Sequence, residues 1–255
     1  MFTKKRKAGA ATAGPAKRRR GPGRPRGPTE QGAAARHELY KTAIKLIAAR
    51  GYEATTLRDI AKRAGVSAGL LYRYFPSKRA VVLALYDELS AEYAARGAKM
   101  APGPWRERFV FALKASLAVL GRQRDTLAAL LPVLVGDAHD GLFAPATALS
   151  RQRVLAVFQE AVTGASDAPD ADDGVALGRV LYLAHLVVIL WWLLDQSPEQ
   201  RATQELVAML ERVLPMAGLA LRLEPARGWL RAADRLSQDA LIGRDEAPRA
   251  TGGGR

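Results

Sequence analysis

The apolar positions of this 255-residue chain recur at helical spacing from Thr29 onward. Tyr40, Ile44 and Ile47 lie three and four residues apart, and Gly51 follows where the helix that they define is expected to end. This spacing predicts an amphipathic first helix that buries one face. Helical periodicity continues through most of the chain, so the pattern predicts an all-α protein.

A tight turn is predicted between the next two helices. Thr56 can cap a helix whose apolar face carries Leu57 and Ile60. Gly65 can adopt the left-handed conformation that ends this helix, and Ser67 can accept hydrogen bonds from the free N–H groups that begin the next one. Two short helices joined by a glycine turn have helix-turn-helix geometry, in which the second helix enters the major groove of DNA.

The third helix has an apolar side formed by Leu70, Leu71 and Phe75. Its other side carries small, aromatic and basic residues: Ser67, Ala68, Tyr72, Arg73 and Tyr74. A solvated surface helix with stray aromatic residues fits this pattern as well. The next helix adds a constraint, because its cap at Ser77 leaves Lys78 at a helix N-terminus, where the dipole disfavours a cation. A facing phosphate accounts better for that lysine.

The rest of the chain is predicted to form a different helical domain. Helices are predicted over 78–98, 105–122, 124–135, 146–162, 175–195 and 199–221. Segments 180–194 and 206–221 are nearly apolar all round, and one domain of this size buries only one face of each helix. A second apolar face predicts a homodimer, and a monomer with both helices internal is the alternative.

The segment 180–194 also has the composition of a membrane span. Its 15 residues, closed by Arg179 and Asp195, fall short of the roughly 20 apolar residues needed to cross a bilayer. We therefore expect a buried helix and no membrane partner.

Charge separates the chain into three parts. Residues 1–28 carry ten Lys or Arg and no acidic residue, residues 29–79 have a net charge of +6, and residues 80–255 have a net charge of −2. The excess of +14 therefore lies in the first third, which suits binding to a polyanion. The chain has no cysteine, so disulfides, thiolate metal sites and cysteine nucleophiles are excluded, and no metal or cofactor is expected.

Residues 1–28 are rich in Pro, Gly, Lys and Arg and contain almost no side chains able to form a core. They are expected to be a disordered basic arm. Their basic start is followed by no apolar run, so they are not read as a secretion signal, and the protein is expected to be cytoplasmic.

The run over 51–83, GYEATTLRDIAKRAGVSAGLLYRYFPSKRAVVL, resembles the DNA-binding domain of the tetracycline-repressor (TetR) family of bacterial regulators. The resemblance rests on the threonines before the second helix, on IAKRAGVS, on LYRYF and on the SK that opens the fourth helix, and it covers residues 30–85. It implies a dimeric all-α repressor. Such a protein has an N-terminal three-helix helix-turn-helix DNA-binding domain and a C-terminal helical ligand-binding and dimerisation domain.

Residue roles carried over by position concern the DNA interface. The resemblance implies that Arg58 and Arg73 lie near base edges. It implies phosphate contacts for Thr56, Tyr72, Tyr74 and Lys78. The front of the recognition helix is expected to face DNA through Ser67, Ala68 and Gly69. Neither alanine nor glycine can hydrogen-bond a base through its side chain, which distinguishes this chain from some relatives.

The stretch GPGRPRG over 21–27 resembles the Gly-Arg-Pro core of AT-hook peptides, which lie in the minor groove. The resemblance implies that Arg24 and Arg26 enter a narrow, A·T-rich groove. It is incomplete, because Pro22 stands where a full hook has an arginine. A nonspecific polycation is the alternative, and both raise DNA affinity through counterion release.

The family also builds a ligand cavity in its C-terminal domain. This region of the chain supplies Tyr93, Phe109, Leu113, Leu117, Leu134, Phe143, Phe158, Tyr182 and His185. Aromatic residues at helical spacing also fit a plain core, and a core histidine with satisfied hydrogen bonds is the alternative for His185. Few charges fall on these faces, so a small apolar ligand is expected, with Tyr182 and His185 as polar contacts.

These predictions combine into one assignment. Residues 1–28 form the basic arm, 29–79 the DNA-binding domain, 80–225 the ligand-binding and dimerisation domain, and 226–255 a partly disordered tail. The chain is expected to be a transcriptional repressor that a small apolar ligand releases from a palindromic operator. A DNA-coating architectural protein without a ligand is the alternative. An enzyme is disfavoured, since the sequence shows no nucleophile–base set, phosphate loop or metal cluster.

Overall fold

The computed structural model describes residues 30–136 and 141–242, and the predictions for the basic arm, including those for Arg24 and Arg26, lie outside these residues. Within the described ranges the chain forms helices joined by short connections and has no strand, which confirms the all-α prediction. The helices are α1 Glu30–Arg50, α2 Leu57–Arg63, α3 Ala68–Tyr74, α4 Lys78–Gly97, α5 Trp105–Leu120, α6 Arg124–Ala129, α7 Leu131–Gly136, α8 Ala148–Thr163, α9 Ala171–Leu194, α10 Arg201–Ala220 and α11 Glu224–Ser237. Single turns at Gly121–Gln123 (η1), Pro145–Thr147 (η2), Pro198–Gln200 (η3) and Gln238–Ile242 (η4) adjoin them.

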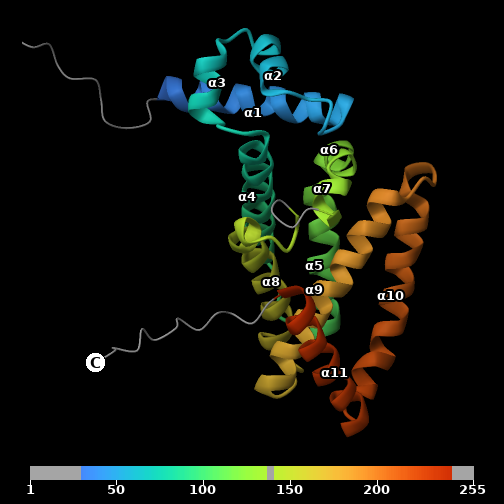
Figure 1. Ribbon diagram of the computed structural model, residues 1–255. Coiled ribbons are helices and arrows are strands. Elements are labelled where there is room, and N and C mark those ends of the chain that lie inside the picture. The colour runs from blue at the N-terminus through green and yellow to red at the C-terminus, as the bar shows by residue number, and fades with distance from the viewer. Residues whose placement is uncertain (1–29, 137–140, 243–255) are drawn as a thin grey trace, which may run out of the picture.

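Figure 1 shows two parts stacked end on end. α1, α2 and α3 form the upper part, and α1 lies across the top of the longer helices. α4 leads into the lower part, where it packs against α5 and α8, and α9 packs against α8. α10 lies on the outer side, and α11 folds back onto α9. The upper part rests on α6 and on the beginning of α4, because α1 packs against both.

The connections of the upper part follow from local sequence signals. Gly51 and Gly65 both have left-handed backbone conformations, with φ of 84° and 67°, where an L-residue with a side chain is disfavoured. Thr56 caps α2 in a capping box with Asp59. Ser67 accepts a hydrogen bond from the backbone N–H of Leu70 at 3.2 Å and so caps α3. The predicted helix-turn-helix is therefore confirmed in its caps and its turn.

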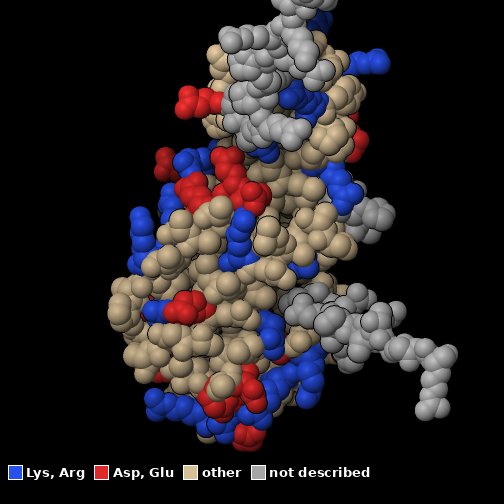
Figure 2. Space-filling model, turned by 90° about the vertical axis from the view of Figure 1, so that its left-hand side faces the viewer, with Lys and Arg blue, Asp and Glu red and all other residues tan. Residues whose placement is uncertain are grey.

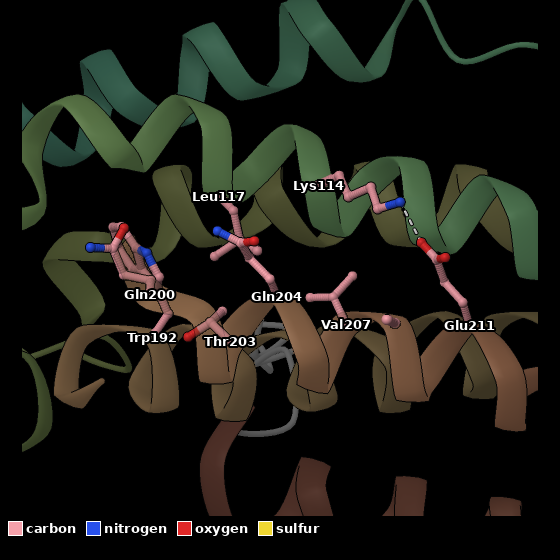
Figure 3. Close-up of a pocket in the computed structure, with 9 residues that line it drawn as sticks. Lys114, Leu117, Trp192, Gln200, Thr203, Gln204, Val207 and Glu211 are labelled. Atoms are coloured by element: carbon pink, nitrogen blue, oxygen red, sulfur yellow. Dashed lines mark ion pairs between the residues drawn. The ribbon is translucent and has the colours of Figure 1, made fainter. Parts of the chain in front are cut away.

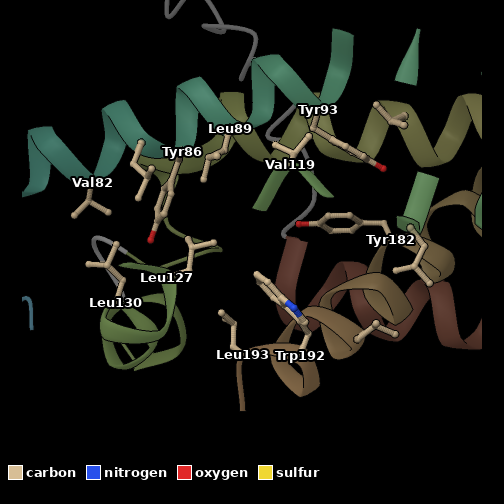
Figure 4. Packing of buried hydrophobic residues seen from close by; sticks show 14 of the residues in the cluster. Val82, Tyr86, Leu89, Tyr93, Val119, Leu127, Leu130, Tyr182, Trp192 and Leu193 are labelled. Atoms are coloured by element: carbon tan, nitrogen blue, oxygen red, sulfur yellow. The ribbon is translucent and has the colours of Figure 1, made fainter. Parts of the chain in front are cut away.

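One continuous apolar core joins the two parts. Figure 4 shows a portion of it, between α4, α6 and α9. Helix α8 sits at its centre between α4 and α9, and two glycines let it approach both. A Cβ added at Gly97 would lie 2.7 Å from Cγ1 of Val157, and one at Gly178 would lie 2.9 Å from the Cα of Gln159. Because contacts this short are excluded for real side chains, both glycines are required by helix packing.

Two stretches differ from the sequence prediction. The single helix predicted over 124–135 is broken at Leu130 into α6 and α7, since Pro132 has no N–H with which to continue the hydrogen bonding of α6. The tail predicted over 226–255 is helical through Ile242 and packs on α9. Leu230 is buried there, and Arg231 bonds the buried Asp173. The helical domain thus extends beyond residue 225.

By length and composition, α9 qualifies as a membrane span, with a mean hydropathy of 1.9 over an 18-residue window. The helix is longer than the 180–194 segment, because it begins at Ala171 and includes Arg179. Its contacts with α8 and α11, and its buried Tyr182 and His185, are those of a core helix.

Candidate DNA interface and regulatory sites

The recognition helix α3 is anchored on one side and open on the other. Leu71 and Phe75 are buried and fix it against the core. The side chains expected to face DNA are exposed at Ser67, Ala68, Gly69, Tyr72 and Arg73. Tyr74 differs, because it is half-buried and packs against the core. The structure therefore presents most of the predicted recognition surface on one exposed helix face.

Arg58 and Arg73 are exposed cations near the two ends of the motif. Arg58 lies in the first turn of α2 and Arg73 in the last turn of α3. In the part of the chain that the structure describes, neither forms an ion pair or a side-chain hydrogen bond with another residue. Both guanidinium groups are therefore available for an external acceptor such as a base edge.

Thr56 has its hydroxyl committed within the protein. The hydroxyl donates to Oδ2 of Asp59 at 2.6 Å and accepts from the Asp59 backbone N–H at 3.1 Å. The bond from the Thr56 hydroxyl and a second one of 3.1 Å from the Thr56 backbone N–H to Oδ2 hold the pKa of Asp59 below its usual range, the hydroxyl bond being the larger cause. A phosphate contact through this hydroxyl would have to displace Asp59, so Thr56 serves here as a helix cap.

Lys78 is also engaged inside the protein. Its ammonium group donates to the backbone carbonyl of Tyr52 at 2.8 Å and lies 4.3 Å from the centroid of the Tyr52 ring. A second, longer bond of 3.4 Å reaches the carbonyl of Glu53. The sequence predicts a phosphate opposite this lysine, but these carbonyls already offset its unfavourable position at the start of α4. Lys78 fastens the connection between α1 and α2.

Charge is distributed unevenly around this interface. Residues 29–79 carry the net charge of +6, whereas Figure 2 shows acidic side chains gathered just below the upper part, on the face drawn. The net positive charge therefore lies in the part of the chain that carries α2 and α3, although Lys and Arg side chains also appear lower on this face, among acidic ones. A polyanion is attracted to that end rather than to the whole molecule.

Five of the predicted pocket residues form an aromatic cluster in the core: Tyr93, Phe109, Phe158, Tyr182 and His185. The ring centroids of Phe158 and His185 lie 4.7 Å apart, and those of Phe158 and Tyr182 lie 6.2 Å apart. Leu113 is buried as well, while Leu117, Leu134 and Phe143 are half-buried. The sequence thus predicted a set that the fold brings together, but the aromatic members pack against one another.

His185 carries the polar chemistry of this cluster. Its Nε2 lies 2.8 Å from the hydroxyl oxygen of Ser116, and burial lowers its pKa to about 3. The imidazole is therefore neutral at physiological pH. Among the described residues, neither Nδ1 of His185 nor the hydroxyl of Tyr93 has a hydrogen-bond partner of good geometry. Burial also raises the pKa of the Tyr93 hydroxyl.

A groove of about 370 Å³ lies between α5, α9 and α10, and none of the five aromatic-cluster residues lines it. Its walls include Lys114, Leu117, Trp192, Thr203, Gln204 and Val207. Leu117 is the one pocket residue predicted from sequence that lines it. Thr203 and Gln204 of α10 were not predicted from the sequence, because they have the pattern of a solvated helix face.

A second surface feature is an apolar face on α9 and α10. Large apolar side chains are exposed at Val187, Trp191, Leu194, Met209, Val213 and Met216. They recur at three- and four-residue spacings on the two helices, which is the pattern of a packed face. Exposure on this scale marks an interaction surface.

The upper part has the geometry of a helix-turn-helix DNA-binding domain, and comparison with known proteins gives its family. Residues 39–85 match the family described as bacterial regulatory proteins, tetR family. The uncharacterised HTH-type transcriptional regulator YuxN of Bacillus subtilis is 45% identical over 49 residues, which are 19% of this chain and 17% of YuxN. The chain therefore spans less than a fifth of that relative.

Two longer matches extend past this domain. The HTH-type transcriptional repressor KstR of Rhodococcus jostii is 28% identical over 187 residues, covering 70% of this chain and 82% of KstR. The crystal structure of a TetR/AcrR-family transcriptional regulator from Thermobifida fusca has a TM-score of 0.52 and 25% identity, over 71% of this chain and 96% of that protein. Residues 39–85 are thus similar to the DNA-binding domain of the tetR family, and the two longer matches extend the similarity into the C-terminal helices.

Proposed function

We propose that this chain is a homodimeric transcriptional repressor that acts in the cytoplasm, binds a palindromic operator and is released from it by a small apolar ligand. The observation that carries the DNA-binding part is the exposed face of α3, which includes Arg73, together with the exposed Arg58 of α2; neither arginine has an ion-pair partner among the described residues. Both arginines are assigned to base edges and Tyr72 to a phosphate. The assignment gives Thr56 and Lys78 supporting roles, because their polar groups are already bonded within the protein.

The front of α3 contributes shape rather than hydrogen bonds. Ala68 and Gly69 are exposed and carry no polar side chain, so the backbone can approach DNA closely there. Arg24 and Arg26 on the basic arm are assigned to the minor groove, as the AT-hook resemblance implies, and the ten cations of the arm add affinity through counterion release.

The homodimer is supported by the apolar face on α9 and α10. A symmetric pair buries the same face on both copies, which is the commonest assembly of soluble proteins. A two-fold pair of recognition helices requires an operator with matching two-fold symmetry. The palindromic operator therefore follows from the homodimer.

The test is a selection of bound sequences from random double-stranded DNA by the purified full chain. An inverted repeat is expected, and fluorescence anisotropy should then show tight binding to that repeat and weaker binding to a scrambled version. A selection that yields no consensus would support the architectural alternative and overturn the proposal. The described residues contain no group of three or more His, Asp or Glu side chains that could hold a metal ion.

A further inference from the structure

The groove between α5, α9 and α10 has the lining of a ligand site. We propose that it is the effector site of this chain and that it takes a small, uncharged molecule with an apolar body and one hydrogen-bonding end. The inference rests on the proposed ligand-responsive function. It places the ligand in this groove instead of within the aromatic cluster.

The apolar part of the groove is formed by Leu117, Trp192 and Val207. Figure 3 shows α5 facing α10 across the groove, with Gln200 at one end and Lys114 and Glu211 at the other. At the Gln200 end Gln204 donates to the carbonyl of Glu199 at 2.9 Å, and its own side-chain carbonyl has no partner among the described residues and can accept. A ligand with an apolar body and one hydrogen-bonding end matches this division.

The charged side chains of the groove favour an uncharged ligand. Lys114 and Glu211 are the charged residues of the lining, and they form an ion pair with each other (Figure 3). An anionic ligand would have to displace Glu211 from Lys114, and a cationic one would have to displace Lys114. A neutral molecule leaves the pair intact at the end of the groove.

Space also favours the groove over the aromatic cluster. Its volume of about 370 Å³ lies near the lower end of the range of about 300 to 1,000 Å³ for ligand sites, so the ligand is small. In the cluster, Phe158 is fully buried and packs on His185, Tyr93 and Tyr182. A ligand there must first displace core side chains.

Backbone strain lies at the end of the groove that Gln200 lines. Glu199 and Gln200 have φ of 54° and 55°, a left-handed conformation that disfavours residues with side chains. Asp195 holds this corner by accepting hydrogen bonds from Ser197 and Thr203. Strain that the surrounding structure maintains is typical of ligand clamps, and Gln200 lines the groove.

The groove is also connected to the DNA-binding domain. Trp192 forms part of its wall, and Arg124 lies with Cζ 5.6 Å from the centroid of the Trp192 ring. Arg124 is the first residue of α6, and α6 packs against α1 (Figure 1). A ligand that moves Trp192 therefore acts on the helix that supports α1, through two side chains in contact.

The test uses N-phenyl-1-naphthylamine, a neutral apolar probe with one N–H that fluoresces when it leaves water. The variant Ala208→Phe places a ring in the groove, and Ala91→Phe, on an exposed face of α4, is the matched control. We expect the full chain to bind the probe, Ala208→Phe to weaken binding by at least about tenfold and Ala91→Phe to leave it unchanged. Circular dichroism of both variants establishes that they are folded.

Two results would overturn the inference. One is a full chain that does not bind the probe, which rejects the assigned ligand class. The other is equal affinity in Ala208→Phe and the full chain, which moves the site elsewhere; loss of binding in Phe158→Leu alone would place it in the aromatic cluster. Neither result bears on the selection of DNA sequences, whose failure would reject the repressor function independently.

Discussion

Arg124 holds the C-terminal end of α9 through the backbone of Trp192. Its guanidinium donates to the carbonyl of Trp192 at 3.0 Å and to that of Asp195 at 2.7 Å. A helix leaves its last carbonyls without partners, and its dipole favours a cation there. Arg124 satisfies both needs from a different helix, and so joins the start of α6 to the end of α9.

Removing this arginine should destabilise the protein. We expect Arg124→Ala to lower the free energy of unfolding in urea by about 1 to 3 kcal/mol, because carbonyls that are partly buried lose their donor. Arg122 is the matched control, since its exposed side chain forms a surface ion pair with Glu92. Arg122→Ala should cost about 0 to 1 kcal/mol. Equal losses of unfolding free energy in the two variants would mean that the bonds from Arg124 to α9 stabilise the protein no more than a surface ion pair does.

The sequence predicted the parts of the fold that depend on neighbouring residues. Gly65 and Ser67 signal the turn before α3 through their own conformational preferences, and the structure agrees. α11 was missed because Pro225 and Gly228 weaken its helical signal, while its stability comes from distant partners such as Asp173. Interactions of that kind depend on tertiary packing, which no local pattern contains.

The candidate sites also divide into features that one segment determines and features that depend on tertiary packing. The exposed face of α3 was predictable because a recognition helix is read from one continuous segment. The aromatic cluster was predicted as a set of residues, but periodicity does not distinguish the wall of a cavity from a closed core. In the structure the aromatic side chains pack against one another and form a closed core. Arg124 has the pattern of an ordinary surface cation, and its contact with Trp192 spans 68 positions of sequence.

The base-reading assignment predicts a difference between specific and random DNA. Arg58→Ala and Arg73→Ala should each cost about 1 to 3 kcal/mol on the selected operator and much less on random DNA, because each loses contacts to base edges. Lys41→Ala is the control, since this exposed lysine lies on α1 and pairs with Glu38. Fluorescence anisotropy on both DNAs is the measurement. Equal losses on the two DNAs would reassign both arginines to phosphates.

The dimer proposal is tested by two neighbouring valines of α9. Val187 is 67% exposed and belongs to the apolar face, whereas Val188 is 5% exposed and belongs to the protomer core. Val187→Asp should dissociate the dimer and leave a folded protomer, because the carboxylate would be buried without a partner only in the dimer. Val188→Asp should unfold the protomer. Sedimentation and circular dichroism separate the two effects, and a dimer that tolerates Val187→Asp would exclude this face.

The docking of α11 depends on one buried carboxylate. Asp173 accepts two hydrogen bonds from Arg231, at 2.5 and 2.9 Å, and these hold its pKa below the usual range. Asp173→Asn should lower the free energy of unfolding by about 1 to 3 kcal/mol, less than for a fully buried pair because Arg231 is partly exposed. Hydrogen exchange should quicken over 224–237. Asp172→Asn, one exposed position earlier, should leave exchange there unchanged.

The buried His185 should make stability depend on pH below neutrality. Burial lowers its pKa in the folded state to about 3, while the unfolded chain takes up the proton near its ordinary value of 6.5. Between these values the unfolded state binds one more proton, so acid favours unfolding and the stabilising contribution is fully present only above 6.5. The lowered carboxylate pKa values act at more acidic pH, since they start from 3.8. The window from 6.5 down to about 4.5 therefore isolates the histidine.

In that window the free energy of unfolding should fall by up to about 1.4 kcal/mol for each pH unit. His185→Gln, which retains a polar partner for Ser116, should have a flatter dependence between pH 6.5 and about 4.5 than the full chain. His37→Gln is the matched control, because this histidine is exposed on α1, and it should keep the slope of the full chain. Urea unfolding at several pH values gives the slopes. If His185→Gln retains the full slope, the ring is not the group that titrates, and the neutral imidazole assigned to the centre of the aromatic cluster is wrong.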